Sequence, residues 1–380
     1  MEKETLYTER LNRIQKTISL STVDRLPVAY AGTAFSPRYM GMSMAEFCED
    51  GEGAVNVTLA AMDRLSGFGE LDAINQPVVG RMTPRLSFAW LSRVSVPGKE
   101  LPPDNLWQVV EAEMMKKDEY DTILKKGWNT YLMEFLPRVI DQDEFNTFLE
   151  WVMLNQERTL GRYKDHGYVA ISDALPAIIP FEYLSGGRSM SKFFFDLYRM
   201  PDKVEAVMKQ MFSETLDQIR AAVPRPGING AWVGGWRSAS AMVAPKLWDR
   251  FVWPYMLEVV EVLVEKGFTP VLHWDQDWTR DLIRLQELPA KKCILNPDGM
   301  TDLTAFKKLV GDRMAVMGDV PSALLSAGTP EDVDIYVKER VDLFQGTGLI
   351  LCPGCDAPIN AKPENMEAFI KAASVHGSSK

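Results

Sequence analysis

The sequence predicts an α/β protein built on a parallel sheet, and two features of its patterning lead to that fold class. Short apolar runs bounded by Gly, Pro or Asp recur along the chain, as expected for strands that are buried on both faces. Amphipathic stretches of helical length separate these runs, and this alternation indicates a parallel sheet. With 380 residues, 46% of them hydrophobic and 25% charged, the chain is expected to form one large globular domain over residues 1–380.

The expected elements follow one another from the N-terminus. Residues 1–23 should form a helical extension, because Leu11, Ile14 and Ile18 share one helical face. Strands are expected at 26–32, 168–172, 231–234, 269–273, 293–296, 314–317 and 349–352, and another should end near Asn75. Amphipathic helices are expected at 202–223 and 247–266. Residues 81–165 should form a mostly helical insertion that covers one end of the strands.

Composition and charge favour some functions over others. The net charge is −10 and the isoelectric point about 5.1, and no run of Lys and Arg could neutralise a phosphate backbone, so no nucleic-acid partner is expected. No segment reaches the ~18 apolar residues of a membrane span, and the polar start lacks a signal peptide, so a cytoplasmic location without a membrane is expected. Four cysteines in so long a chain do not indicate a disulfide framework. No G-x-G-x-x-G opens a helix after the first strand, which disfavours a dinucleotide-binding sheet.

The stretch Val271-Leu-His-Trp-Asp275 is the most informative for chemistry. Residues two apart on a strand point to the same face, so His273 and Asp275 should project together at the strand's C-terminal end. Cys352 and Cys355 flank a Pro-Gly turn at another strand end and can face one point. Imidazole, carboxylate and thiolate are zinc ligands. The same spacing also fits a hydrogen-bonded core histidine with cysteines that serve as small apolar residues.

Several other residues are candidates for binding a substrate. Tyr30, Trp236 and Trp274 lie near expected strand ends, where aromatic faces suit a flat or methylated compound, although single Trp residues more often serve in packing. Arg237 can bind an anionic group or form a surface ion pair. Asn75 can hydrogen-bond a substrate or cap a helix.

An ordered series of motifs resembles the uroporphyrinogen decarboxylase superfamily. It includes Asp24-Arg-Leu-Pro-Val28, Ala244-Pro-Lys-Leu-Trp-Asp-Arg-Phe-Val-Trp-Pro-Tyr255, Gly318-Asp-Val-Pro321 and Pro353-Gly-Cys-Asp-Ala-Pro358, and the similarity spans roughly residues 10 to 372. The resemblance implies a single (β/α)8 TIM barrel. The decarboxylase branch carries an Arg-rich segment after the first strand, but here only Arg38 occurs in that region, so porphyrinogen decarboxylation is disfavoured.

The other branch comprises the cobalamin- or corrinoid-dependent methyltransferases, which bind zinc through His-x-Cys and a later Cys. His273 and Cys355 match the outer ligands of that pattern, while Asp275 stands where the family has Cys; Cys352 is an alternative thiolate. The resemblance therefore implies zinc on His273, Asp275 and Cys355, with His273 and Asp275 as catalytic residues. The methyl group would pass from a small methoxylated or N-methylated compound to Co(I) of a separate corrinoid protein, because this chain lacks the Asp-x-His-x-x-Gly context of a cobalamin carrier.

Three other functions remain open from the sequence. The protein could act at the second step and methylate a thiol or tetrahydrofolate. It could be a metal-free decarboxylase acting on a smaller acid, or a barrel that only binds a ligand or partner. Metal content separates the methyltransferase from the last two.

Overall fold

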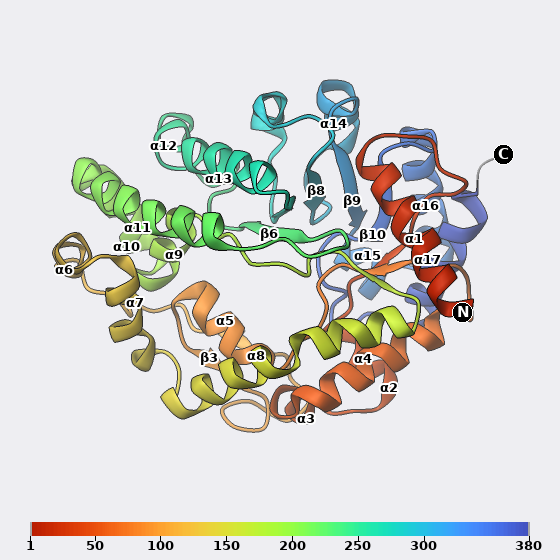
Figure 1. The fold of residues 1–380 in the computed structure, drawn as a ribbon, viewed down its shortest axis with the longest axis horizontal. Helices are drawn as coiled ribbons and strands as arrows, with labels where there is room; N and C mark the ends of the chain where they lie inside the picture. The colour runs from red at the N-terminus through yellow and green to blue at the C-terminus, as the bar shows by residue number, and fades with distance from the viewer. Residues whose placement is uncertain (1, 379–380) are drawn as a thin grey trace.

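The computed structural model describes residues 2–378, in which strands and helices alternate along the chain (Figure 1). The strands are β1 (Ala29–Tyr30), β2 (Ala73–Ile74), β3 (Val94–Ser95), β4 (Gln108–Val109), β5 (Val169–Ala170), β6 (Gly230–Gly235), β7 (Thr269–Trp274), β8 (Ile294–Pro297), β9 (Ala315–Val320) and β10 (Leu349–Pro353). The α-helices are α1 (Glu2–Ile18), α2 (Phe35–Met40), α3 (Met44–Glu49), α4 (Gly51–Leu65), α5 (Met82–Trp90), α6 (Glu119–Lys126), α7 (Trp128–Phe135), α8 (Gln142–Asp165), α9 (Pro180–Gly187), α10 (Met190–Arg199), α11 (Pro201–Ala221), α12 (Pro245–Phe251), α13 (Trp253–Glu265), α14 (Leu303–Val310), α15 (Ser322–Ala327), α16 (Pro330–Phe344) and α17 (Pro363–His376). Two 3₁₀ segments, η1 (Leu136–Arg138) and η2 (Thr279–Glu287), complete the described elements.

The main strands pair in parallel, which confirms the predicted α/β class. One sheet has the order β1-β2-β5 and the other the order β10-β9-β8-β7-β6. Isolated parallel bridges join Val28 to Leu351 and Pro176 to Trp232, so the two sheets contact each other at both edges. In the register of the larger sheet, His273 of β7 lies beside Asn296 of β8.

The structure has a strand at each of the seven expected ranges and one that ends next to Asn75, and it differs from the expected elements in two local features. β2 is only two residues long and ends directly before Asn75. The small antiparallel pair β3–β4 within the insertion was not predicted. The helix expected at 247–266 is divided between α12 and α13 at Val252, two residues before Pro254, because proline has no N–H to continue the helical hydrogen bonds.

Strand side chains alternate between an interior cluster and a helix-facing core. The interior cluster consists mainly of small or branched residues from all the main strands and the segments flanking them: Ala29, Ala31, Ala73, Val169, Ile171, Ile228, Val271, Ile294, Met317, Ile350 and Cys352. Their strand neighbours, such as Tyr30, Leu272 and Leu295, belong to the larger core beneath the helices. Because the period of a strand is two, this division also fixes which strand-end residues point inward.

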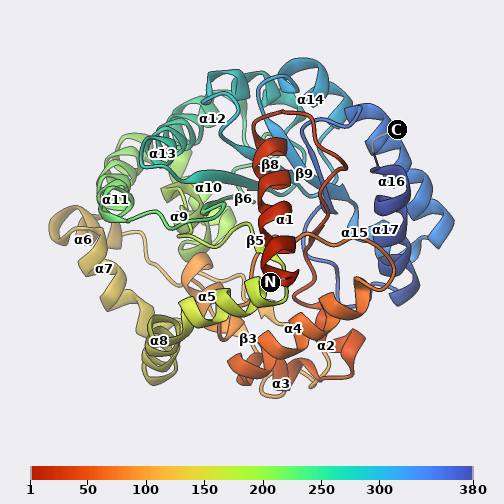
Figure 2. The same ribbon diagram turned by 45° about the vertical axis from the view of Figure 1, so that its right-hand side comes forward.

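Helix α1 covers the N-terminal end of the strands, where it crosses in front of them in Figure 2. Ile14 and Ile18 enter the interior cluster, which explains the apolar face seen in the sequence. The fully buried carboxylate of Asp72 fixes this end, because it lies 2.8 Å from Arg13 Nη1 and 2.7 Å from Arg25 Nη1. With this end filled, the loops that follow the strands are left to form a site at the C-terminal end.

The segment between β2 and β5 is mostly helical, with α5 to α8 and the short β3–β4 pair. Helix α8 lies on the opposite side of the strands from α13 in Figure 1. No helix in the described part of the chain combines the length and apolar character needed to cross a membrane.

Candidate metal centre

Three side chains that the sequence singled out meet at the C-terminal end of the strands. His273 is the fifth residue of β7, Asp275 follows that strand directly, and Cys355 lies in the loop after β10. His273 Nε2 lies 3.6 Å from Asp275 Oδ1 and 3.7 Å from Cys355 Sγ. The candidate ligand atoms of the three residues all lie within 4.8 Å of one another. This group of nitrogen, oxygen and sulfur donors can hold a metal ion.

The orientation of His273 is set by a buried amide that the sequence analysis did not identify. Asn296 Nδ2 donates to the backbone oxygens of Met317 (2.7 Å) and Gly354 (3.2 Å), so the amide oxygen must face the other way. That oxygen lies 2.7 Å from His273 Nδ1, which therefore carries the proton and donates it. The Nε2 lone pair is left pointing toward Asp275 and Cys355, as metal coordination requires.

A second amide extends this network away from the three donors. Asn75 Nδ2 donates to Asn296 Oδ1 at 2.9 Å, and Asn75 Oδ1 accepts from Ser172 Oγ at 3.0 Å. Asn75 was predicted to bind substrate, and the structure places it within the chain of hydrogen bonds Ser172–Asn75–Asn296–His273. Its oxygen and one amide hydrogen are thus engaged in supporting the imidazole.

Burial and neighbouring carboxyl groups perturb the acidic donors. Burial raises the pKa of Asp275, and the approach of Asp298 adds to that rise while His273 opposes it. Burial raises the pKa of the Cys355 thiol well above its usual range, with Asp275 and Asp356 contributing. Both donors are thus held in surroundings that disfavour negative charge unless a cation is nearby.

The loop that carries Cys355 is held close to its neighbours on both sides. A side chain at Gly354 would collide with the backbone of Asp298, since a Cβ there would lie 2.6 Å from the Asp298 carbonyl carbon. The next residue but one, Asp356, accepts the backbone N–H groups of Thr33 (2.6 Å) and Ala34 (2.8 Å) after β1. Burial raises the pKa of the Asp356 carboxyl to about 6.

A row of aromatic rings extends from the imidazole along the end of β6. The ring centroid of Trp232 lies 5.7 Å from that of His273 and 5.7 Å from that of Trp236, and Trp236 lies 4.8 Å from Trp90 of α5. Gly234 makes room for this row, because a Cβ there would lie 2.3–2.5 Å from the rings of Trp232 and Trp236. Gly234 near the end of β6 therefore accommodates indole rings.

The remaining predicted substrate-binding residues lie in different surroundings. Arg237 forms an ion pair with Glu111 and packs 5.0 Å over the ring of Trp90. Tyr30 and Trp274 belong to the helix-facing core, where Tyr30 bonds Ser36 at 2.6 Å and Trp274 stacks on Trp278 at 4.1 Å. Neither side chain is part of the group formed by His273, Asp275 and Cys355.

The other cysteines lie apart from the three donors. Cys352 is fully buried in the interior cluster and is absent from the donor group among the described residues. Cys48 and Cys293 are buried in the helix-facing core.

Glu182 is a second functional candidate that sequence reasoning missed. It lies on α9, is fully buried, and accepts the backbone N–H groups of Trp236 (2.9 Å), Arg237 (3.1 Å) and Ser238 (3.0 Å). Burial raises the pKa of this carboxyl to about 7, against the opposing effect of those donors. It fixes the path of the loop that carries the aromatic row.

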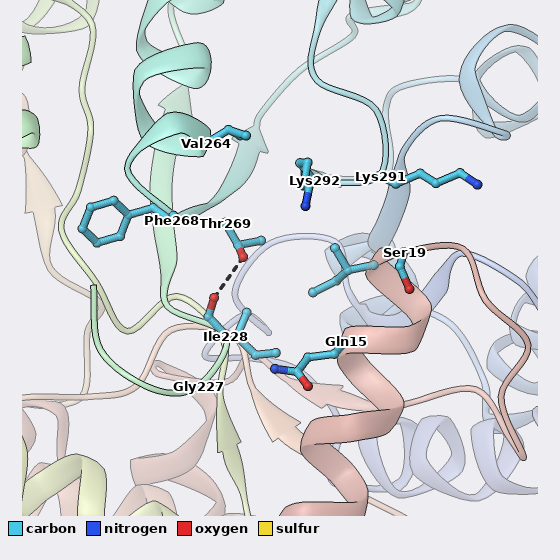
Figure 3. Close-up of a pocket in the computed structure, with 11 residues that line it drawn as sticks. Gln15, Ser19, Gly227, Ile228, Val264, Phe268, Thr269, Lys291 and Lys292 are labelled. Carbon is cyan, nitrogen blue, oxygen red and sulfur yellow. Dashed lines mark hydrogen bonds between the residues drawn. The ribbon is translucent and has the colours of Figure 1, made fainter. Parts of the chain in front are cut away.

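A separate cavity of about 270 Å³ lies at the opposite end of the strands (Figure 3). Its walls come from α1, from the start of β7 and from the segments that precede β6 and β8. The residues labelled in Figure 3 include Gln15, Ile228, Thr269 and Lys292. This cavity lies beside the helix that fills the N-terminal end, so it is distinct from the metal centre.

The chain belongs to the uroporphyrinogen decarboxylase family. The family profile, Uroporphyrinogen decarboxylase (URO-D), matches residues 179–376, just over half of the chain, and this range includes all three donors. Among solved structures, a methyltransferase from Methanosarcina mazei superposes with a TM-score of 0.68 at 16% sequence identity. The match covers 96% of this chain and 98% of that chain, and at this identity it establishes a shared fold. No curated protein matches the sequence.

Proposed function

We propose that the protein is a zinc-dependent methyltransferase that moves a methyl group from a methoxylated or N-methylated compound to Co(I) of a separate corrinoid protein. The observation that carries this proposal is the convergence of His273, Asp275 and Cys355, with Asn296 fixing the imidazole so that Nε2 faces the other two donors. Membership of the uroporphyrinogen decarboxylase family and the fold shared with a methyltransferase support it.

The two donor separations from His273 match those expected around a zinc ion. Tetrahedral coordination at Zn–N, Zn–O and Zn–S distances of about 2.0–2.3 Å requires neighbouring ligand atoms to lie about 3.5 Å apart. The separations from His273 Nε2 are 3.6 Å to Asp275 Oδ1 and 3.7 Å to Cys355 Sγ. A three-residue set leaves one tetrahedral position for a substrate atom, as in catalytic zinc sites.

The metal ion and the residues around it would have different roles in the reaction. Zinc in this site would act as a Lewis acid that polarises the heteroatom carrying the methyl group. Asn296 holds the imidazole in one tautomer. Trp232 packs beside His273, and Trp236 stacks on Trp232, so apolar surface lies on one side of the imidazole. Asp275 replaces a thiolate of the family pattern with a weaker electron donor, which favours polarising an ether or amine.

We also propose that the strands close into a single (β/α)8 barrel in the cytoplasm, with the corrinoid protein covering its C-terminal mouth. The parallel bridges Val28–Leu351 and Pro176–Trp232 support closure, because they join the two sheets at both edges. Methyl transfer needs the reacting atoms within about 3–3.5 Å of each other, so the partner must reach the loops around Trp236 and Trp278.

Metal analysis of protein purified without chelator tests the zinc site. We expect one zinc per chain, and we expect Cys355→Ala to lower the occupancy to about a tenth or less because a ligand is lost. Cys293→Ala is the matched control, since this buried thiol belongs to the helix-facing core and should leave the zinc content unchanged. Equal zinc contents in the two variants would contradict the assignment.

A spectroscopic assay tests the reaction. The zinc-loaded protein is mixed with a reduced corrinoid protein and a panel of methoxyaromatics, methylamines and betaines, and loss of the Co(I) absorption band is followed. At least one donor should deplete the band, and Cys355→Ala should abolish that change. No change with any donor would leave a decarboxylase acting on a smaller acid as the better explanation of the family membership.

A further inference from the structure

The segment that follows β6 is held by a single buried carboxylate. Its residues 236–238 belong to no strand or helix, so their backbone N–H groups have no partner in regular structure. One oxygen of Glu182 accepts the N–H groups of Trp236 (2.9 Å) and Ser238 (3.0 Å), and its other oxygen accepts that of Arg237 (3.1 Å). Backbone donors inside a protein are nearly always paired, and here one side chain supplies the acceptors for three consecutive residues.

Helix α9, which carries Glu182, is a fixed base for this loop. All eight residues of α9 are buried. A Cβ at Gly186 would collide with the backbone oxygen of Trp90, so α9 packs directly against the end of α5. Figures 1 and 2 both show these two helices side by side. Helix α9 therefore sets the position of two rings of the aromatic row, Trp90 through this packing and Trp236 through Glu182.

The loop continues directly from the part of β6 that borders the metal centre. Gly234 lies opposite His273 in the register of β6 and β7. The next residue, Gly235, accepts the backbone N–H of Asp275 at 2.8 Å, and Trp236 comes immediately after it. Because the strand and the loop are one continuous chain, a shift of Trp236 also displaces the residue that holds Asp275.

The supports of the other two metal donors are separate from this one. Asn296 orients His273, and the loop after β10 is anchored to the segment after β1. The backbone of Asp275 is held by Trp278 Nε1, which donates to its carbonyl at 2.7 Å, and by the end of β6, which accepts its N–H. Glu182 fixes the residues that follow that end, so it supports the part of the centre that Asn296 does not reach.

We propose that Glu182 is a positioning residue for the metal centre, where it fixes the side formed by Asp275 and the aromatic row. This inference rests on the proposed zinc site. Without the carboxylate, the backbone N–H groups of the loop would turn toward other acceptors. Trp236 would then leave its place against Trp232, whose ring centroid lies 5.7 Å from that of His273. Asp275 would lose a fixed neighbour, and the three donors would hold a metal ion less tightly.

A purely structural role for this carboxylate is the alternative, and Asn365→Ala is the matched control for it. Asn365 is also fully buried and also satisfies three backbone groups, because its Nδ2 donates to the oxygens of Leu324, Leu325 and Gly328. These contacts lie between α15 and α17, away from the end of β6. Loss of Asn365 should therefore disturb the fold to a similar degree without moving the aromatic row.

Binding of Co(II), a spectroscopic substitute for zinc, tests the effect on the metal centre. The assay is run at pH 8, where the Glu182 carboxyl, with a pKa of about 7, is ionised. Glu182→Ala should bind Co(II) roughly ten-fold more weakly than the wild type and show displaced ligand-field bands, because contacts that support metal ligands typically contribute about 10- to 100-fold to affinity. Glu182→Gln should lie between the two, since its amide oxygen can still accept the N–H groups of Trp236 and Ser238 while its NH2 group faces the N–H of Arg237. Asn365→Ala should bind Co(II) as the wild type does.

Near-ultraviolet circular dichroism of the metal-free protein tests the position of the row independently of any metal. Trp236→Phe should change the spectrum of the wild type, because this ring packs against Trp232 and Trp90 in a fixed geometry. The same replacement should change the spectrum of Glu182→Ala much less, because the ring would no longer be held in one place. In Asn365→Ala it should have the same effect as in the wild type.

The two measurements separate the role of Glu182 from the zinc function. The role is overturned if Glu182→Ala keeps the wild-type Co(II) affinity and spectrum, if Asn365→Ala loses as much affinity, or if Trp236→Phe has the same effect in Glu182→Ala as in the wild type. A wild-type protein that binds neither Co(II) nor zinc would contradict the proposed function. A diminished effect of Trp236→Phe in Glu182→Ala would still support the positioning of the row by Glu182 in that case.

Discussion

Replacing Asn296 by Ala should separate the metal site from the stability of the fold. The side chain is fully buried, and its oxygen accepts hydrogen bonds from both His273 Nδ1 and Asn75 Nδ2. Alanine removes that acceptor and leaves two buried donors without a partner. His273 would then be free to rotate or to change tautomer, and Nε2 would no longer be directed at Asp275 and Cys355.

The expected size of the effect follows from these contacts. Loss of a hydrogen-bond partner that orients a metal-binding histidine typically lowers metal affinity about 10- to 100-fold. Two unsatisfied buried donors cost about 1–3 kcal/mol each, so the free energy of unfolding should fall by roughly 2–6 kcal/mol. Both changes should therefore be seen in Asn296→Ala.

The matched control is Asn365→Ala. Asn365 is also fully buried, and its Nδ2 donates to the backbone oxygens of Leu324, Leu325 and Gly328. It has no contact with His273, so its replacement should lower stability and leave zinc affinity unchanged. Zinc affinity is measured by competition with a chromophoric chelator, and stability by urea unfolding of the metal-free protein.

Comparison of the two variants decides whether the network tunes the metal site. If Asn296→Ala binds zinc within about three-fold of wild type, the orientation of His273 does not depend on Asn296. Equal losses of zinc affinity in both variants would mean that loss of stability alone weakens the site. Either result would refute the role assigned to the amide.

Three other predictions follow from the burial and charge of single side chains. Ile14→Ala should lower the free energy of unfolding by about 2–5 kcal/mol in urea titrations, whereas Ile335→Ala, on an exposed face of α16, should change it by less than about 0.5 kcal/mol. The carboxyl of Glu182 has a pKa raised from 4.5 to about 7, so its contribution to stability is fully present below pH 4.5 and is lost as the pH rises through 7. Urea unfolding of the wild type between pH 5 and 8 should show a decline of up to about 3 kcal/mol from this group, and Glu182→Gln should decline less. Uroporphyrinogen should yield no decarboxylated product by chromatography, because Arg38 is exposed and no Arg-rich segment follows β1; detectable product would contradict this.

The sequence predicted most of the strands because each is a buried apolar run with clear boundaries. The pair β3–β4 was missed because strands of two residues leave no periodic pattern to detect. His273, Asp275 and Cys355 could be named from strand spacing and family resemblance, since residues at the C-terminal ends of parallel strands meet at one edge. Their distances depend on the loop after β10, which no local pattern specifies.

The sequence contained enough information to place Tyr30 and Trp274 correctly. Both residues alternate with inward-facing neighbours, Ala29 and His273 respectively, so strand periodicity alone assigns them to the helix-facing side. Asn296 gave a similar signal, because it ends a predicted strand in the position that His273 occupies on the neighbouring strand. Glu182 gave none, because a buried carboxylate is recognisable only from its surroundings.

The two ends of the strands differ in whether their buried carboxyl groups are neutralised by neighbouring cations. At the N-terminal end, the buried Asp72 is surrounded by Arg13 and Arg25, so its charge is neutralised within the fold and contributes to structure. At the C-terminal end, the carboxyl of Asp275 lies near other acids, and burial raises its pKa. A fold can keep such uncompensated groups only where the rest of the structure stabilises them, as the Asn296 network and the Asp356 contacts do here. The C-terminal end therefore has the electrostatic character that the proposed metal ion at His273 would complete.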